Sequence, residues 1–393
     1  MPEPRKIRDD ERELVAELYN NAYRVGAATG RAWIENADLD ETIAFVEEGR
    51  VASIVRMLPY TIWIGGHEVA MGGISGVATW MDCQGKGYAG ELMRRSVALM
   101  RERGLWTTAL YPFAHRYYRR FGWETAGDRM VYSEITQSDL NRYDERHLVR
   151  AALRADDGEK IAAVYKRYAQ RYNGMVSRTD ANWQWRLSNL TGQGGQAYLI
   201  EEAGEAAGYF FCENQRSPSC VESRTIELAC LTPAAWRAMM GFLATLPNVV
   251  TRISVTAPVF PPLFEHFSEP TLHARRQPSF MFRVVDVEQA VARRGYPDHA
   301  HGGITIAIRD ECGAWNDGTW ELQFSDGKGI AVKTTARKPD LELTIQRFSQ
   351  LYLGYIDLAG LSDHGMLPRS DMDKLRLLRN AFHDRPPYLM DAF

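Results

Sequence analysis

Apolar and polar positions follow two periods along the chain, and the changes between these periods predict its elements. Apolar residues three and four positions apart, as in Leu14, Val15 and Leu18, are typical of amphipathic helices. Runs rich in β-branched and aromatic side chains are typical of strands, and paired glycines between them indicate hairpins. The first stretch therefore predicts helices over about residues 10–50, strands over 51–58, 60–64 and 71–79, a hairpin at Gly65-Gly66, a helix over 88–103 and a strand over 106–111.

Two further stretches show the same mixture of periods, separated by a run of prolines between residues 258 and 270. In the second stretch the pattern predicts a helix over 159–172, strands over 197–201 and 207–213, a strand and a helix within 225–246, and a strand over 252–256. In the third it predicts a helix over 287–294, strands near 304–308, 319–324 and 330–334, and helices from residue 343 onward. Three units of mixed α/β (α+β) structure are expected.

Composition restricts the class of protein. The 393 residues are 45% hydrophobic and 25% charged with a formal net charge of -3, which excludes a strongly basic nucleic-acid footprint and a polybasic membrane patch. The first residues lack an apolar signal core, and no apolar run approaches the roughly 20 residues that span a bilayer. Five scattered cysteines without zinc-ligand spacing favour reduced thiols. We expect a cytoplasmic protein with no metal, nucleic-acid or membrane partner.

A glycine-rich loop stands where the strand over 71–79 leads into the helix over 88–103. Its sequence is Gln84-Gly85-Lys86-Gly87-Tyr88-Ala89. The two glycines permit close approach of a ligand to the backbone, and the free amides of a helix start favour a bound diphosphate. Taken alone, the loop has two interpretations, a diphosphate site or a plain turn between strand and helix. A triphosphatase is disfavoured because Lys86 is followed by glycine, and the loop lacks the Gly-x-Gly-x-x-Gly pattern of dinucleotide sites.

The loop and its surroundings resemble the acetyl-CoA motif of the GNAT N-acetyltransferases, [Arg/Gln]-x-x-Gly-x-[Gly/Ala], here matched by Gln84, Gly87 and Ala89. The resemblance implies that the preceding strand pairs with the pantetheine arm of acetyl-CoA, the co-substrate, and that the loop amides hold its pyrophosphate. The implied cofactor residues are Val77, Ala78, Thr79, Gln84, Gly85, Lys86, Gly87, Tyr88, Ala89 and Phe113. Two departures stand out. Gln84 replaces a frequent arginine, which removes one fixed charge, and Met81 replaces a frequent proline.

The segment Tyr111-Pro-Phe-Ala-His-Arg-Tyr-Tyr-Arg-Arg-Phe-Gly-Trp123 is also similar to a GNAT motif. The similarity implies a tyrosine beside the sulfur of coenzyme A. A phenol of pKa about 10 can protonate the departing thiolate, and Tyr118 is the expected general acid. A packed aromatic with a satisfied hydroxyl is the alternative. Tyr117 points about 100° away on the same turn and is expected to pack. His115 is an alternative base or a surface histidine.

Across all three units, the chain resembles the Eis (enhanced intracellular survival) acetyltransferases. The resemblance implies a catalytic GNAT domain over 1–138, a degenerate GNAT domain over 139–284 and a sterol-carrier-protein-like domain over 285–393. The degenerate domain has Leu231-Thr-Pro-Ala-Ala-Trp236 in place of the cofactor loop. The resemblance also implies a homo-hexamer, and a C-terminal carboxylate, here that of Phe393, that acts as the base for the substrate amine. An idle, frayed terminus is the other interpretation of Phe393.

Three aromatic residues, Tyr23, Trp33 and Trp185, are candidates for a wall that recognises an amine cation, or are plain core residues. The pair His299 and His301 lacks a nearby third ligand and indicates a solvated loop. The sequence therefore predicts an acetyl-CoA-dependent N-acetyltransferase acting on a small primary amine, such as an aminoglycoside, a polyamine or a lysine side chain. The alternatives are a lipid- or sterol-binding carrier and a non-catalytic coenzyme A-binding regulatory module.

Overall fold

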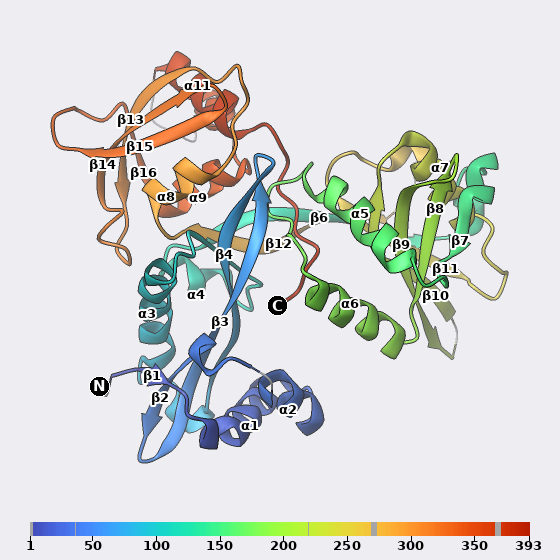
Figure 1. Cartoon of the computed structure of the whole chain (residues 1–393), viewed down its shortest axis with the longest axis horizontal. Coiled ribbons are helices and arrows are strands. Elements are labelled where there is room, and N and C mark those ends of the chain that lie inside the picture. The colour runs from blue at the N-terminus through green and yellow to red at the C-terminus, as the bar shows by residue number, and fades with distance from the viewer. Residues whose placement is uncertain (1–2, 36, 219, 269–272, 366–370) are drawn as a thin grey trace. The chain divides into compact units, whose positions relative to one another are not determined.

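The computed structural model describes residues 3–35, 37–218, 220–268, 273–365 and 371–393 (Figure 1). The chain divides into two compact units. The first unit gathers Met1–Ala126, Phe280–Asp384 and Asp391–Phe393, and the second gathers Gly127–Ser279 and Arg385–Met390. Each unit combines helices with a sheet, so the mixed α/β fold class is confirmed. Among the described residues, the helices are too short or too polar to cross a membrane.

The N-terminal part of the first unit contains the glycine loop. Its elements are β1 Arg5–Lys6, a 3₁₀ turn Asp9–Glu11, α1 Arg12–Tyr23, α2 Ala27–Glu35, a 3₁₀ turn Leu39–Glu41, β2 Thr42–Glu47, β3 Arg50–Ile64, β4 His67–Thr79, a 3₁₀ turn Met81–Cys83, α3 Tyr88–Glu102, β5 Thr107–Leu110 and α4 His115–Arg119. In the sheet the order of strands is β1-β2-β3-β4-β5-β12, where β12 is His273–Val284. The pair β4 and β5 is parallel, and α3 crosses between them, while the other pairs are antiparallel.

The helix α3 confirms the helix predicted over 88–103 and ends one residue earlier, at Glu102. Met93, Val97 and Met100 are fully buried in the core between this helix and the sheet. Gly104 follows the end of the helix with a φ of +73°, a left-handed conformation that glycine adopts at low cost. The hairpin at Gly65 and Gly66 is also confirmed, since both residues have positive φ between β3 and β4.

Two predictions for the first stretch are wrong. Residues 42–47 form the strand β2, not part of a helical run, and its first four residues are buried against neighbouring elements. Burial on both faces removes the alternation that would have identified this strand. The two strands predicted at 51–58 and 60–64 are one strand, β3. Pro59 is tolerated within it because the pairing of β3 with β2 runs only to Arg56.

The C-terminal part of the first unit has a four-stranded sheet of its own in the order β15-β14-β13-β16 (Figure 1). Its elements are α8 Val287–Arg293, β13 Gly302–Arg309, β14 Gly318–Ser325, β15 Lys328–Thr334, β16 Leu341–Thr344, α9 Ile345–Leu353, α10 Leu358–Asp363 and α11 Met372–Phe382. A buried ion pair joins this part to the end of β12: Arg283 contacts Asp310 at 2.8 Å and also donates to the carbonyl of Phe121. This guanidinium lies where a Cβ on Gly122 would be, which fixes the turn after α4.

The second unit is built on the same plan as the N-terminal part of the first. Its elements are β6 Glu124–Ile135, two 3₁₀ turns Gln137–Asp139 and Asp144–Leu148, β7 Val149–Ala151, α5 Asp157–Ala169, α6 Asp180–Gly192, β8 Gln196–Glu202, β9 Glu205–Ser217, β10 Cys220–Cys230, α7 Pro233–Leu243, β11 Arg252–Pro258 and a 3₁₀ turn Phe264–His266. The order of strands is β7-β8-β9-β10-β11-β6. As with β4 and β5, the pair β10 and β11 is parallel and a helix, α7, crosses between them.

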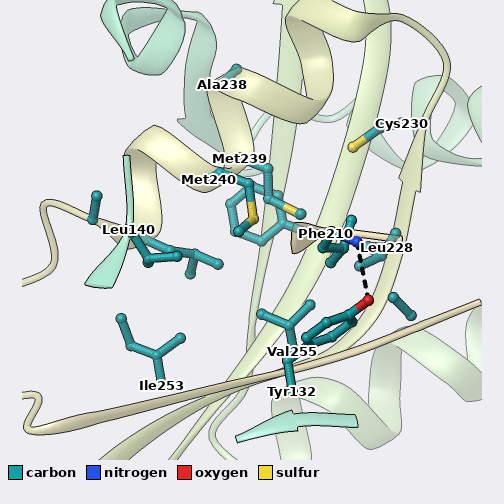
Figure 2. Close-up of a cluster of buried hydrophobic side chains, with 14 of the residues drawn as sticks. Tyr132, Leu140, Phe210, Leu228, Cys230, Ala238, Met239, Met240, Ile253 and Val255 are labelled. Carbon is teal, nitrogen blue, oxygen red and sulfur yellow. Dashed lines mark hydrogen bonds between the residues drawn. The ribbon is translucent and has the colours of Figure 1, made fainter. Parts of the chain in front are cut away.

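The core of the second unit lies between α7 and its sheet (Figure 2). Met239 and Met240 of α7 pack against Phe210 and Val255 of the strands, and all four side chains are fully buried. Tyr132 of β6 accepts a hydrogen bond at 3.0 Å from the backbone of Leu263, which satisfies its hydroxyl inside this apolar cluster.

The last strand of each main sheet comes from a distant part of the chain. The strand β12, late in the sequence, pairs with β5 in the first unit. The strand β6, which follows β5 along the chain, instead pairs with β11 in the second unit. Because of this exchange, the compact units are not contiguous segments, whereas the domain boundaries expected at residues 138 and 284 describe contiguous ones. Those boundaries stay a prediction.

Candidate active site

The strand β4 changes its pairing just before the glycine loop. Its register with β3 shifts where Ser75 is opposite Arg56 and Ala78 is opposite Ile54, which places Gly76 and Val77 in a β-bulge. Gly76 has a φ of +59°, and a Cβ there would lie 2.4 Å from the ring of Trp33. Glycine is therefore required at this position by both its backbone conformation and its neighbour.

The last residues of β4 extend beyond its other neighbour, β5. The pairing of β4 with β5 runs from Met71 opposite Thr107 to Ile74 opposite Leu110, where β5 ends. In the described structure the segment from Ser75 to Thr79 therefore has no β5 partner along this edge. Unpaired backbone groups at the end of a strand can bond an extended ligand that carries amides, in the manner of an added strand.

The loop has the geometry that its two glycines suggested. Gly85 and Gly87 have φ values of +81° and +86°, and an added Cβ on either would meet no atom within 4 Å. The positive φ, and not steric contact, is therefore what requires glycine here. Gly87 caps α3 without a side-chain bond. The amides of the first turn have no carbonyl partner inside the helix, so they can receive an anion.

A hollow of about 390 Å³ lies against this loop and helix start. Among the residues predicted to bind the cofactor, those that line it are Thr79, Gln84, Gly85, Gly87, Tyr88 and Ala89. It is also lined by Arg94, Tyr117 and Arg120, which were not among the predicted site residues. Arg120 could have been found from the motif itself, because it is the basic residue before Phe121-Gly122. Arg94 has no motif signal and is identified only by its place on α3.

Four predicted cofactor residues do not line this hollow. The ammonium group of Lys86 pairs with Glu47 at 2.7 Å, so its charge is already neutralised. The carbonyl of Val77 accepts a hydrogen bond from the Tyr23 hydroxyl at 3.2 Å. The carbonyl of Ala78 accepts one from Ser53 at 3.1 Å. Phe113 is exposed, and its ring contacts that of Tyr118 edge-on at 5.2 Å.

Tyr118 lies on α4 in the core of the first unit, with a side chain that is almost fully buried. Burial raises the pKa of its phenol well above 10, and the neighbouring phenols of Tyr23 and Tyr117 raise it further. At neutral pH the hydroxyl therefore holds its proton. His115 begins the same helix and is half-buried. Its role as an alternative base stays a prediction.

Tyr117 packs as expected, with ring contacts to Phe113, Tyr118 and Phe121 between 5.1 and 5.5 Å. Its hydroxyl, however, is buried without a hydrogen-bond partner among the described residues. Because an unsatisfied buried hydroxyl is costly, and this residue lines the hollow, a ligand atom there would remove the penalty.

Two of the predicted wall residues, Tyr23 and Trp33, come together on α1 and α2. Tyr19 connects them, since its ring lies parallel to Trp33 at 4.1 Å and contacts Tyr23 at 4.7 Å. The guanidinium of Arg56 lies 4.9 Å from the centre of the Trp33 ring and pairs with Glu41 at 2.8 Å. These contacts fix the indole beside the bulge of β4.

Trp185, the third predicted wall residue, lies on α6 in the second unit, where its side chain is 55% exposed. Its role in substrate binding stays a prediction. His299 and His301 are exposed between α8 and β13. Within the described ranges of the chain, three or more His, Cys, Asp and Glu side chains do not gather in a group that could hold a metal ion.

The C-terminal residue lies against the middle of β4. A Cβ on Gly73 would be only 2.8 Å from the ring of Phe393, which also contacts Tyr60 at 5.3 Å and Tyr111 at 5.5 Å. The Tyr111 hydroxyl donates to the carbonyl of Asp391 at 2.6 Å. Burial, followed by the charge of Asp391, raises the pKa of Tyr60 to about 12. The chain end is therefore packed inside the first unit near the strand that leads to the loop.

The equivalent position in the second unit has no such loop. There β10 leads into α7 through Thr232, whose hydroxyl accepts a hydrogen bond from the amide of Ala235, and Pro233 has no amide to offer. The strand also carries Glu227, a buried carboxylate paired with Arg178 at 2.7 Å. A capped helix start and a buried negative charge both disfavour a diphosphate.

Comparison with known proteins agrees with this arrangement. Models of the acetyltransferase (GNAT) domain match residues 3–126 and 174–284, and a model of the sterol carrier protein domain matches residues 287–390. A search of curated proteins found no significant match.

Solved structures share the fold over the whole chain. A GCN5-related N-acetyltransferase from Anabaena variabilis is 22% identical, covers 100% of both chains and has a TM-score of 0.90. One from Kribbella flavida is 23% identical with a TM-score of 0.84, covering 100% of this chain and 98% of that one. Eis1 from Mycobacterium abscessus is 20% identical, covers 100% of both chains and has a TM-score of 0.81. The chain is thus an acetyltransferase with two GNAT domains followed by a sterol carrier protein domain, and over its whole length it shares the fold of Eis1.

Proposed function

We propose that this protein transfers the acetyl group of acetyl-CoA directly to a small-molecule primary amine in the cytoplasm. The observation that carries the proposal is the hollow beside the start of α3. It is lined by the left-handed glycine loop, by Thr79 at the end of β4 and by Tyr117, whose ring contacts that of the neighbouring Tyr118. The loop amides would bind the pyrophosphate, and the segment from Ser75 to Thr79 would pair with the pantetheine arm.

In the reaction the amine nitrogen attacks the thioester carbonyl carbon, the carbon–sulfur bond breaks, and the sulfur takes up a proton. Tyr118 supplies that proton as general acid. Its raised pKa fits this role, because the burial that disfavours the phenolate also disfavours a thiolate beside it. The pKa values of the phenol and the thiol therefore rise together, and the proton can still pass from one to the other.

The amine must also lose a proton, and the carboxylate of Phe393 is the proposed base or anchor for the substrate cation. Support comes from the packing of Phe393 against Gly73 and Tyr60, which holds the chain end in one place. Tyr23 would offer a ring face to the amine cation, and Trp33, whose ring is covered by Tyr19 and Arg56, would complete this aromatic wall. Aminoglycosides, polyamines and lysine side chains are the acceptor classes to test, and a homo-hexamer is the assembly to test by light scattering.

Release of free thiol from acetyl-CoA in the presence of each acceptor tests the proposal. We expect Tyr118→Phe to lower kcat by about 100-fold to 10,000-fold, the usual contribution of a positioned acid or base. Deletion of Phe393 should lower kcat with every acceptor. Arg309→Gln, an exposed change far along β13, is the matched control and should leave turnover unchanged. Turnover that survives both Tyr118→Phe and the deletion would contradict the catalytic assignment.

A further inference from the structure

We infer that Arg94 and Arg120 bind the diphosphate of coenzyme A and supply the charge that Gln84 does not. This inference rests on the proposed function, since it concerns the same cofactor. It places the cationic part of the site on α3 and directly after α4, outside the glycine loop. Both arginines are exposed and line the hollow against the start of α3.

The two guanidinium groups flank one phenyl ring. The Cζ of Arg94 lies 5.5 Å from the centre of the Phe121 ring, and the Cζ of Arg120 lies 5.3 Å from it. Phe121 is fully buried in the core, so this ring is a fixed platform. Stacking on an aromatic face orients a guanidinium while leaving its N–H groups free to bond phosphate oxygens.

Carboxylates engage few of the N–H groups of these two arginines. Arg94 has a single ion-pair contact, with Glu91 at 3.2 Å on the exposed face of α3. Arg120 has no ion pair among the residues that the structure describes, and it lies near the ring of Tyr117 at 5.3 Å. Two like charges around one ring repel each other unless an anion is bound between them, so the pair favours a phosphate group.

The loop does not present a free positive charge to the hollow. Gln84 is neutral, and the ammonium group of Lys86 is bound by both carboxylate oxygens of Glu47 at 2.7 and 2.8 Å. A bound diphosphate would otherwise meet only backbone amides and the helix dipole. Arg94 on α3 and Arg120 directly after α4 complete the site with full positive charges.

The position of Arg120 indicates the diphosphate and not a more distant phosphate. One of its terminal nitrogens lies 3.9 Å from where a Cβ on Gly90 would be, and Gly90 is the third residue of α3. This is the turn whose free amides would face a bound anion. The unsatisfied hydroxyl of Tyr117 lines the same hollow, and burial raises the pKa of this phenol, so it stays a donor at neutral pH.

Titration calorimetry of the purified full-length protein with coenzyme A tests the inference. We expect Arg94→Gln and Arg120→Gln each to weaken binding about tenfold, as the loss of one charge-assisted hydrogen bond would. Arg95→Gln is the matched control. Arg95 is exposed on the same helix and, like Arg94, contacts a glutamate, but it does not line the hollow, so its loss should change Kd less than twofold.

A substitution that adds a positive charge gives a second test, because it does not remove any contact of the two arginines. Gln84→Arg should tighten binding of coenzyme A in the otherwise unchanged protein, and should restore most of the affinity lost in Arg94→Gln. Dephospho-coenzyme A, which keeps the diphosphate but lacks the 3′-phosphate, should show the same losses. If its affinity were insensitive to both arginine variants, the assignment to the diphosphate would be overturned.

The failure of this inference can be told apart from failure of the proposed function. If the unchanged protein does not bind coenzyme A at all, both fall. If it binds coenzyme A and the two arginine variants bind equally well, the inference alone is overturned. Thermal melting without ligand should show the same Tm for the Arg94, Arg95 and Arg120 variants, because all three side chains are exposed.

Discussion

Substitution of Gly73 by alanine should displace the end of the chain without removing any of its atoms. Gly73 lies in the middle of β4, between Leu58 of β3 and Ala109 of β5. The new methyl group would be 2.8 Å from one ring carbon of Phe393 and 3.1 Å from a ring carbon of Tyr60. The backbone of the strand is held on both edges, so the side chains must move.

The size of the displacement follows from these distances. Ordinary contact for a Cβ begins near 3.4 Å, so the ring of Phe393 must retreat from 2.8 Å by about 0.6 Å or more. A misplacement of about 1 Å in a catalytic group can cost about 100-fold in rate. We therefore expect kcat to fall about tenfold to 100-fold. The KM for acetyl-CoA should stay nearly constant, because Gly73 does not line the cofactor hollow.

Steady-state thiol release measures the effect, and a double-mutant cycle assigns it. Phe393→Ala removes the ring that the new methyl group would strike, so Gly73→Ala added to Phe393→Ala should change kcat by less than about twofold, apart from the residual contact with Tyr60. Gly158→Ala, at a helical glycine with open space around it in the second unit, is the control for a glycine change as such.

Three outcomes would refute this reasoning. The first is an unchanged kcat in Gly73→Ala. The second is additivity of the two substitutions, which would mean that the methyl group acts by a route other than the ring of Phe393. The third is a fall in Tm well beyond the 2–4 °C that about 1 kcal/mol of strain causes in a domain of this size, which would indicate general damage to the sheet.

Three further predictions concern the loop, the buried charges and the proton donor. Gly87→Ala should add about 1–2 kcal/mol of backbone strain at a φ of +86° and weaken coenzyme A binding about fivefold to 30-fold by calorimetry, and an unchanged Kd would contradict this account of the loop. Burial raises the pKa of Glu227, but the charges of Arg178 and Arg186 outweigh it and lower the pKa from 4.5 to about 2. The stabilisation that the charged Glu227 gives the folded state is then complete above pH 4.5 and is lost as the pH falls toward 2. Arg178→Met should lower the free energy of unfolding, measured with urea at pH 7, by about 3–5 kcal/mol. Because the pKa of Tyr118 lies above 10, its phenol keeps its proton from about pH 7 to 9.5, and the ratio of kcat between the unchanged protein and Tyr118→Phe should be constant over this range. A fall in this ratio would show that the phenol loses its proton and is less buried.

The cofactor loop and its helix could be predicted because their signals are local. The order of Gln84, Gly85 and Gly87 before an amphipathic helix fixes positive φ values and a helix start within a few residues. The helix stop at Gly104 follows from the same short-range chemistry. These features depend on the conformational limits of individual residues and on periodicity within one element.

The rest of the site depends on contacts between residues far apart in the sequence. Phe393 meets Gly73 more than 300 positions away, and no periodicity records such a contact. The strand β2 was missed because burial on both faces hides its alternation. In the sequence, Arg94 is an ordinary charged residue on an exposed helical face. Only the folded structure places Phe121, which follows α4, beside it.

The exchange of last strands has a consequence for the synthesis of the protein. The sheet of the first unit closes only when Met281 pairs with Leu110, about 170 positions earlier, and that of the second when Ile253 pairs with Ile135. Loop closure over such separations is slow relative to local helix and hairpin formation. A chain that leaves the ribosome from its N-terminus therefore holds β5 as an open edge while the whole second unit is being made. The sheet of the first unit is therefore completed only after the second unit has been made, and a fragment ending at residue 138 would expose that edge and tend to aggregate.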